Sequence, residues 1–233
     1  MAKHLLILLF SIFFISNSAN ALQMAEIEYI VPIDYKLLNE QDINTYAEQY
    51  YKDYLNTKDT KALQNMLTTY TLLSNIDEKN PLYLTRVGIA YDKMKTDRLA
   101  KSYFYRSMCV AGQNPYVYSA FGDFWFDRTR YRKALHNYLT SNDYGYDTNF
   151  NNLEKLGMCY EKLGDYKSAI KYYKMAIQIN QGDTEEVKKK NEELTNKIQM
   201  LEALLLENPN YNNTEKGQKK EWRNSYYQLL YLV

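Results

Sequence analysis

The chain has 233 residues and an almost balanced charge, with 29 Lys and Arg against 28 Asp and Glu, and only two histidines and two cysteines. This balance argues against a nucleic acid or an anionic membrane as the main partner. The shortage of histidine and cysteine leaves little material for His-dependent catalysis or for a Cys/His metal site.

Residues 1–21 have the form of a secretory signal peptide. The basic residue Lys3 precedes an apolar run over residues 5–15. The tripeptide Ala19-Asn20-Ala21 then has the small-x-small pattern of a cleavage site. The run is shorter than the roughly 20 apolar residues that a membrane span needs. We therefore expect cleavage before Leu22 and a periplasmic or secreted protein with no integral membrane span. An uncleaved N-terminal anchor is the alternative.

Two stretches come before the central part of the chain. Residues 22–39 mix apolar and polar side chains around Pro32 and predict an extended arm. Residues 40–80 predict two helices, in which Ala62 and Met66 have the spacing of the second helix of the repeat described next. We interpret residues 40–80 as a degenerate N-terminal helical repeat.

Residues 81–182 contain three copies of one pattern, which begin at Pro81, Pro115 and Phe150. Positions four, seven, eight and eleven of each copy mark one face of a helix, and positions twenty, twenty-four and twenty-seven mark a face of a second helix. The recurring residues are Leu84, Val87, Gly88, Tyr91, Ala100, Phe104 and Ser107 in the first copy, Tyr118, Phe121, Gly122, Trp125, Ala134, Tyr138 and Ser141 in the second, and Leu153, Leu156, Gly157, Tyr160, Ala169, Tyr173 and Ala176 in the third. A fixed period of this length predicts a solenoid.

Small and capping residues place the helices within each copy. Gly at position eight and Ala at position twenty predict that the two helices cross closely there. Asn80-Pro81 and Asn114-Pro115 predict helix starts with Asn as N-cap and Pro in the first turn. Gly164 predicts a helix end and Asp165 the next N-cap. The third copy lacks the proline, and its extra residue falls in the preceding linker.

Two further helices are predicted after the repeats. A charged helix over residues 183–207 has apolar side chains on one face and would cap the last repeat. Residues 208–233 begin with a polar linker and end in an amphipathic helix, whose apolar residues are Trp222, Tyr226, Leu229 and Leu230. We expect this last helix to pack on the solenoid or to dock on another molecule.

The repeat pattern resembles that of the tetratricopeptide repeat family over residues 81 to about 182. Seven positions agree in residue type in all three copies, whereas the family's proline near the end of the repeat is replaced by Gly112, Tyr146 and Gln181. The resemblance implies an all-α, right-handed helical-repeat solenoid with terminal capping helices. It also implies a scaffold that binds other proteins.

In the family, the stripe beside the buried face of the first helix lines a concave groove. The resemblance therefore assigns to the groove Leu82, Thr85, Ile89, Asp92 and Lys93 of the first copy, Tyr116, Ser119, Asp123, Phe126 and Asp127 of the second, and Asn151, Glu154, Met158, Glu161 and Lys162 of the third. We expect Phe126 and Met158 to point away from the core and to contact a peptide segment or helix of a protein partner. The basic cluster with which some members hold a peptide's terminal carboxylate is not reproduced.

Catalytic and metal-binding patterns are missing from the sequence. His136 is the only histidine after residues 1–21 are removed, whereas nucleophilic mechanisms need a histidine beside the nucleophile. No HExxH, P-loop or GxGxxG pattern is present. Cys109 and Cys159 lie in non-adjacent copies, so we expect two free, buried thiols. We expect no enzyme activity, no cofactor and no metal.

The sequence thus predicts an exported scaffold in an envelope-associated complex, with a protein partner in the groove and no nucleic-acid partner. An accessory subunit that binds a glycan or cell-wall component is the alternative, for which Phe126 and Tyr116 would supply aromatic surfaces. An enzyme is a more remote alternative. The sequence leaves the oligomeric state and the identity of the partner open.

Overall fold

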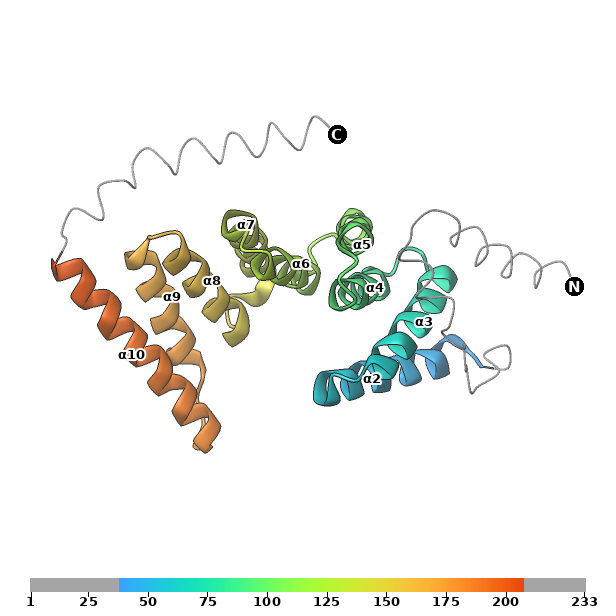
Figure 1. The fold of residues 1–233 in the computed structure, drawn as a ribbon, viewed down its shortest axis with the longest axis horizontal. Helices are drawn as coiled ribbons and strands as arrows, with labels where there is room; N and C mark the ends of the chain where they lie inside the picture. Colours follow the sequence, from blue (N-terminus) through green and yellow to red (C-terminus); the bar gives the residue numbers. More distant parts are fainter. Residues whose placement is uncertain (1–37, 208–233) are drawn as a thin grey trace, which may run out of the picture. The chain divides into compact units, whose positions relative to one another are not determined.

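The computed structural model describes residues 38–207, which are all-α and contain no strand (Figure 1). Its helices are α2 (Glu40–Thr57), α3 (Thr60–Ile76), α4 (Pro81–Lys93), α5 (Asp97–Ala111), α6 (Pro115–Asp127), α7 (Tyr131–Ser141), the π-helical turn η2 (Asn142–Tyr146), α8 (Phe150–Lys162), α9 (Tyr166–Ile179) and α10 (Glu185–Glu207). The predicted signal peptide, nearly all of the predicted arm and the predicted C-terminal helix lie outside the described residues. The chain divides into residues 1–43 and 44–233, and the packing described below is that of residues 44–207.

Each copy of the repeat forms a pair of packed helices, as the spacing predicts. In order along the chain, α4 packs on α5, α6 on α7, and α8 on α9. Consecutive pairs stack through contacts of α5 with α6 and of α7 with α8, while α3 packs on α4 and α10 packs on α9. Leu194, Ile198 and Leu201 are the buried residues of α10. Helices α3 to α10 thus each pack against a neighbour, which is the packing of a helical-repeat solenoid.

The helix starts follow the capping chemistry of the sequence. The side chains of Asn80 and Asn114 accept hydrogen bonds from the backbone N–H groups of Leu82 and Tyr116, each at 3.1 Å, with a proline in the first turn. Asp165 accepts one from the N–H of Ser168 at 3.0 Å. These bonds satisfy backbone donors that the helix itself leaves free.

The glycine at position eight makes room for the aromatic ring at position twenty-four. A Cβ atom on Gly157 would lie 2.5 Å from the Tyr173 ring, and one on Gly122 would lie 2.6 Å from the Tyr138 ring. At Gly88 the corresponding distance, to the Phe104 ring, is 3.3 Å. The close crossing predicted from the small residues is therefore present, and it is tightest in the second and third copies.

Helix α3 extends the repeat toward the N-terminus in a register that the sequence analysis missed. Ala62 and Met66 are both buried, but the residue that occupies the aromatic position is Tyr70, which is fully buried and lies 34 residues before Phe104. Ala62 and Met66 have the same spacing as Met66 and Tyr70, so the sequence alone did not fix this register. Helix α3 is therefore equivalent to the second helices α5, α7 and α9.

Two backbone features set the turns around the helix pairs. The residue that reverses the chain between first and second helices has positive φ in every copy: 61° at Lys95, 57° at Thr129 and 80° at Gly164. Only the third copy places a glycine there, which adopts this conformation without strain. The extra residue between the second and third copies is taken up in η2, where Gly145 has a φ of 112°.

Candidate functional site

The residues assigned to the groove, here called the groove stripe, lie on the first helices α4, α6 and α8. Ile89, Phe126 and Met158 are half-buried and pack against the hydrophobic core. The expectation that Phe126 and Met158 point away from the core is therefore wrong. Residues at positions nine and twelve border the buried face of the helix, so a large side chain there covers core residues and exposes only its outer surface.

Some residues of the groove stripe serve the fold rather than an open surface. Thr85 has no exposed surface, and its hydroxyl oxygen lies 2.7 Å from Ser107 Oγ and donates to the Pro81 carbonyl oxygen at 2.7 Å. Its side chain offers nothing to a groove ligand, which corrects its assignment. Glu154 is largely covered, with 14% of its side chain exposed and Lys190 of α10 at 2.9 Å.

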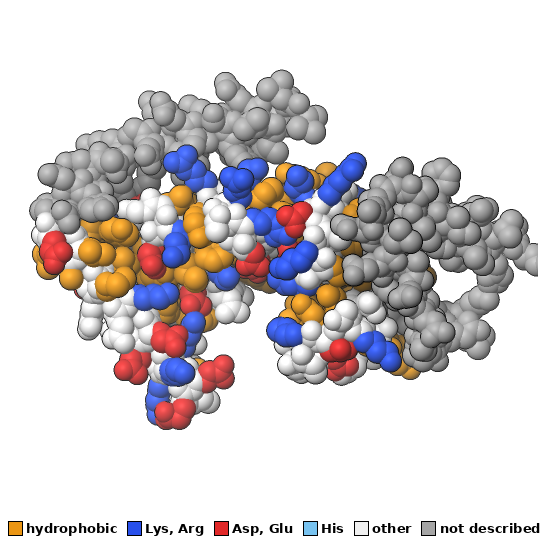
Figure 2. Space-filling model, viewed as in Figure 1, with side chains coloured by type: hydrophobic (Ala, Val, Ile, Leu, Met, Phe, Trp, Pro, Cys, Tyr) orange, Lys and Arg blue, Asp and Glu red, His pale blue; other side chains and the backbone are white. Residues whose placement is uncertain are grey.

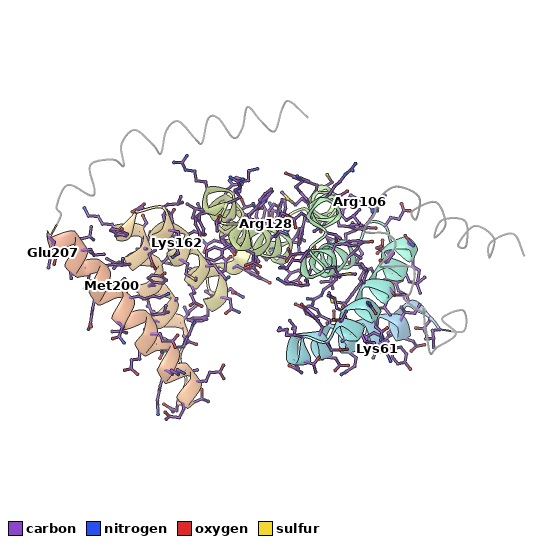
Figure 3. All side chains as sticks on the ribbon, in the orientation of Figure 1. Lys61, Arg106, Arg128, Lys162, Met200 and Glu207 are labelled. Atoms are coloured by element: carbon purple, nitrogen blue, oxygen red, sulfur yellow. The ribbon has the colours of Figure 1, made fainter. Side chains whose placement is uncertain are left out.

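An ionic network joins the first two copies. Lys93 Nζ lies 3.1 Å from Asp92 Oδ2 and 3.4 Å from Asp127 Oδ2. Arg128, which follows α6 (Figure 3), contacts Asp92 Oδ1 at 2.8 Å and also pairs with Asp97. The same guanidinium lies 3.7 Å from the centre of the Phe124 ring. Asp92 is 6% exposed, and its burial is tolerated because two cations neutralise it.

The network moves the pKa of several of its members. The hydrogen bond from Arg128 lowers the pKa of Asp97, and the same bond raises the pKa of Arg128. Burial opposes the positive charge of Lys93, but the neighbouring Asp92 and Asp127 outweigh it and raise its pKa. These charges therefore persist across the physiological pH range and remain paired with each other.

Buried tyrosines of the second helices hold two acids of the groove stripe. The Tyr138 hydroxyl donates to Asp123 Oδ1 at 2.7 Å, and the Tyr173 hydroxyl donates to Glu161 Oε2 at 2.6 Å. Burial raises the pKa of both tyrosines, and the adjacent carboxylates raise it further. The tyrosines at position twenty-four thus reach through the helix pair and fix the orientation of acids on the groove side.

Lys155 connects an acid and an aromatic ring of the groove stripe. Its Nζ atom lies 3.6 Å from Asp123 Oδ1 and 4.4 Å from the centre of the Phe126 ring. The Phe126 ring also meets Tyr131 edge-on, with 5.4 Å between ring centres. Phe126 is consequently held between a cation and a second ring.

The rest of the groove stripe is more open. Asn151, Lys162, Lys93 and Asp127 are exposed, whereas Leu82, Tyr116 and Ser119 are half-buried. About half of the Asp123 side chain, 51%, is exposed. The open part of the stripe therefore combines short polar groups, the paired charges of Lys93, Asp123 and Asp127, and the exposed Lys162.

The comparisons with known proteins agree with this architecture. The tetratricopeptide repeat family model matches residues 154–183, which lie in the third copy. PilF of Pseudomonas aeruginosa has a similar fold, with a TM-score of 0.55 at 16% identity over 68% of this chain and 72% of that one. PilW, described as a widely conserved type IV pilus biogenesis factor, has a TM-score of 0.51 at 18% identity over 60% of this chain and 63% of that one. The chain is a tetratricopeptide repeat protein. The curated proteins gave no match.

Sequence reasoning missed the residue that ties the N-terminal helices of this tetratricopeptide repeat protein to its repeats. Arg86 of α4 stacks on Tyr51 at 3.6 Å from the ring centre, donates to the Tyr116 hydroxyl at 2.6 Å, and lies 3.6 Å from Glu48. Glu48 also accepts a hydrogen bond from Tyr70. Arg86 lies next to the groove stripe but is not part of it. The equivalent position of the second copy, 34 residues later, is Ala120, so the repeat pattern did not mark this position as functional.

Other reactive groups of the tetratricopeptide repeat protein lie apart from one another. His136 is half-buried on α7, and burial lowers its pKa, which favours the neutral imidazole. The two cysteines are not bonded to each other, and burial raises the pKa of Cys159 to about 12. Cys109 is exposed, contrary to the expectation of two buried thiols, because it faces outward on α5. Between residues 38 and 207, no group of three or more His, Cys, Asp or Glu residues is placed to hold a metal ion.

Within residues 38–207, no helix combines the length and the apolar character that a membrane span needs.

Proposed function

We propose that the groove stripe binds a segment of a protein partner and that the protein is a scaffold of an envelope-associated complex. The observation that carries this proposal is the state of the charges around Ile89, Phe126 and Met158. Lys93 is paired with Asp127, and Lys155 with Asp123, across adjacent helix pairs. A surface whose central charges are already paired gains little from a charged ligand there, and it favours a segment held by apolar contacts and hydrogen bonds.

The proposed location draws on two separate observations. The sequence predicts export from residues 1–21, and PilW, whose fold is similar, is described as a type IV pilus biogenesis factor. A complex of the cell envelope would account for both the predicted export and the similarity of fold to PilW. The proposal for this chain is a scaffold role and does not extend to the pilus itself.

The glycan alternative is less well supported. Stacking on a sugar ring requires an open aromatic face, but Lys155 lies over the Phe126 ring, and the Tyr116 hydroxyl accepts a hydrogen bond from Arg86. Burial also raises the pKa of the half-buried Tyr116. Each ring thus already has a cationic partner, Lys155 for Phe126 and Arg86 for Tyr116.

Site-specific photo-crosslinking in the native host tests the proposal. A photoreactive phenylalanine analogue at Ser119 should give a discrete crosslinked protein product, whereas the same analogue at Thr60, on α3, should give none. The product from Ser119 should fall by about 30-fold, as for the loss of an interface hot spot, when Asn151→Arg places a charge in the stripe. Asn196→Arg on α10 is the matched control. Equal products from Ser119 and Thr60 would contradict the proposal.

A further inference from the structure

The repeats separate their charges between first and second helices. The second helices α5, α7 and α9 together contain eight Lys and Arg residues and one acid, Asp97, which Arg128 neutralises. The first helices α4, α6 and α8 contain four Lys and Arg residues against five acids. The near-neutral balance of the whole chain therefore conceals a local excess of positive charge. Figure 2 shows Lys and Arg side chains gathered over α5 and α7.

Three of these cations form a row with the period of the repeat. Arg98, Arg132 and Lys167 occupy position eighteen of the three copies, and all three are exposed. Position eighteen lies opposite the buried alanine and aromatic positions of the second helix, so the row faces outward. Equivalent positions on stacked helix pairs point in the same direction at roughly the spacing of packed helices, about 10 Å.

The row belongs to a wider surface, here called the basic face. It is formed by Arg98, Lys101, Arg106, Arg132, Lys167 and Lys171, all of which are exposed. None of the six forms an ion pair with another residue in the described range, whereas Lys93, Arg128 and Lys155 near the groove stripe each do. The three residues of the row also oppose the dipoles of their own helices, because they lie in the first turn. The fold therefore gains nothing evident from their charge.

Apolar surface is interspersed among these cations. Tyr105 is 48% exposed and Val110 is 38% exposed on α5, beside Lys101 and Arg106. A tyrosine has an apolar ring and a polar hydroxyl, and it is favoured at the boundary between lipid and water. Lysine and arginine at such a boundary extend their charged ends toward phosphate groups while their alkyl chains cover apolar surface.

We propose that the basic face binds the surface of a membrane that contains anionic phospholipids. Its cations, which form no ion pair within residues 38–207, lie on α5, α7 and α9, which suits a broad surface whose phosphate headgroups can move to meet them. The exposed Tyr105 and Val110 add the apolar component that lipid binding uses and that a phosphate backbone alone does not require. The apolar segment at residues 5–15 predicts that the chain crosses or stays at a membrane, which favours lipid over nucleic acid.

The test uses the full chain and sedimentation with vesicles of phosphatidylcholine, with and without added phosphatidylglycerol. The test variant is Arg98→Glu/Arg132→Glu/Lys167→Glu. Its new acids favour the helix dipoles, so the variant is expected to fold. The charge-matched control is Lys52→Glu/Lys61→Glu/Lys189→Glu, which changes three exposed lysines outside the basic face, one of them labelled in Figure 3.

The expected result is binding that requires phosphatidylglycerol and weakens as salt is raised. The test variant should lose on the order of 100-fold in partitioning, because each basic residue near an anionic surface contributes about fivefold. The control variant should lose far less. Equal binding of the two variants, or equal binding to neutral and anionic vesicles, would overturn the proposal. Tighter binding to duplex RNA or to polyglutamate than to the anionic vesicles would overturn it in favour of another polyanion.

Discussion

The first helices and the position-eighteen row of the second helices treat their charged residues in different ways. On the first helices, Lys93 and Lys155 have acidic partners on the neighbouring helix pair, and Arg128, just after α6, pairs with acids of the first copy. On the second helices, Arg98, Arg132 and Lys167 have no such partners in the described part of the chain. One repeat can therefore build two surfaces. On the first, the charged side chains are paired with acids or bases of neighbouring helices. On the second, the charged side chains remain available to a ligand. Only the first kind should matter for stability.

The largest effect on stability is expected where the glycine of a first helix contacts the aromatic ring of the second helix. Gly157→Ala places a Cβ atom 2.5 Å from the Tyr173 ring, which is enclosed on all sides. Overpacking of this kind should lower the free energy of unfolding by about 1–3 kcal/mol. Denaturant unfolding provides the measurement. Gly88→Ala, with 3.3 Å to the Phe104 ring, is the control and should cost less. An equal loss of stability in both variants would show that the distance between the glycine and the aromatic ring does not determine the loss.

Removal of Arg128 should produce the next largest effect. Among the described residues, Arg128→Ala leaves the buried Asp92 with Lys93 as its single paired cation, so we expect a loss of about 1–2 kcal/mol in the free energy of unfolding. Arg98→Ala on the basic face is the matched control and should change it by less than about 0.5 kcal/mol. Similar losses in the two variants would remove the contrast between the two kinds of helix.

The Arg128 effect should also depend on pH. The pKa of Asp97 is lowered by Arg128, so this pair stabilises the fold above the ordinary pKa of the carboxyl, 3.8, and the benefit disappears as the pH falls through the lower value in the folded state. The difference in Tm between wild type and Arg128→Ala should therefore narrow in acid. A difference that stays constant down to acid unfolding would contradict this contribution.

The bond between a second-helix tyrosine and a first-helix acid should make a smaller contribution. Tyr138→Phe removes the donor to Asp123 and should cost about 1 kcal/mol. Since the pKa of Tyr138 is raised above its ordinary value of 10.0, its stabilising effect is complete below that pH and is lost as the pH rises. Thermal unfolding between neutral and alkaline pH should therefore show a weaker pH dependence in Tyr138→Phe than in wild type. Phe104 is the natural example of a repeat without this hydroxyl.

The smallest effect on stability is expected at the turn between the first and second helices of a copy. Thr129 is a β-branched residue with a φ of 57°, where glycine is favoured. Thr129→Gly relieves this strain but increases the entropy of the unfolded chain, so a net gain of about 0.5 kcal/mol is expected. Gly164→Ala, at the equivalent turn of the third copy, should have the opposite sign. Calorimetric Tm values that move in the same direction for both variants would contradict this reading.

The sequence predicted the parts of the fold that depend on neighbours in the chain. The repeat period, the N-caps at Asn80 and Asn114, the turn at Gly164 and the helix crossing at Gly157 all follow from residue types at fixed offsets. Helical periodicity and capping are local rules, so each can be recognised without knowledge of the rest of the molecule. The same local rules did not fix the register of α3, because alternative alignments four residues apart both place apolar residues on one helix face.

The candidate site was less predictable, since the sequence indicates which helix face a residue occupies but not what lies opposite. Arg86, Arg128 and Lys155 are long side chains whose partners come from neighbouring helix pairs, and only the stacking of those pairs brings them together. For the same reason, only the structure shows that Thr85 is enclosed and that Cys109 is exposed.

The sequence by itself determined an all-α helical repeat whose paired helices cross closely at a glycine. The repeat period, the helix caps and the small residues all act through short-range geometry. The tertiary structure alone decided which charges are neutralised and which remain available. Charge pairing depends on distances between side chains from different helix pairs, and the total charge of a chain contains no information about those distances.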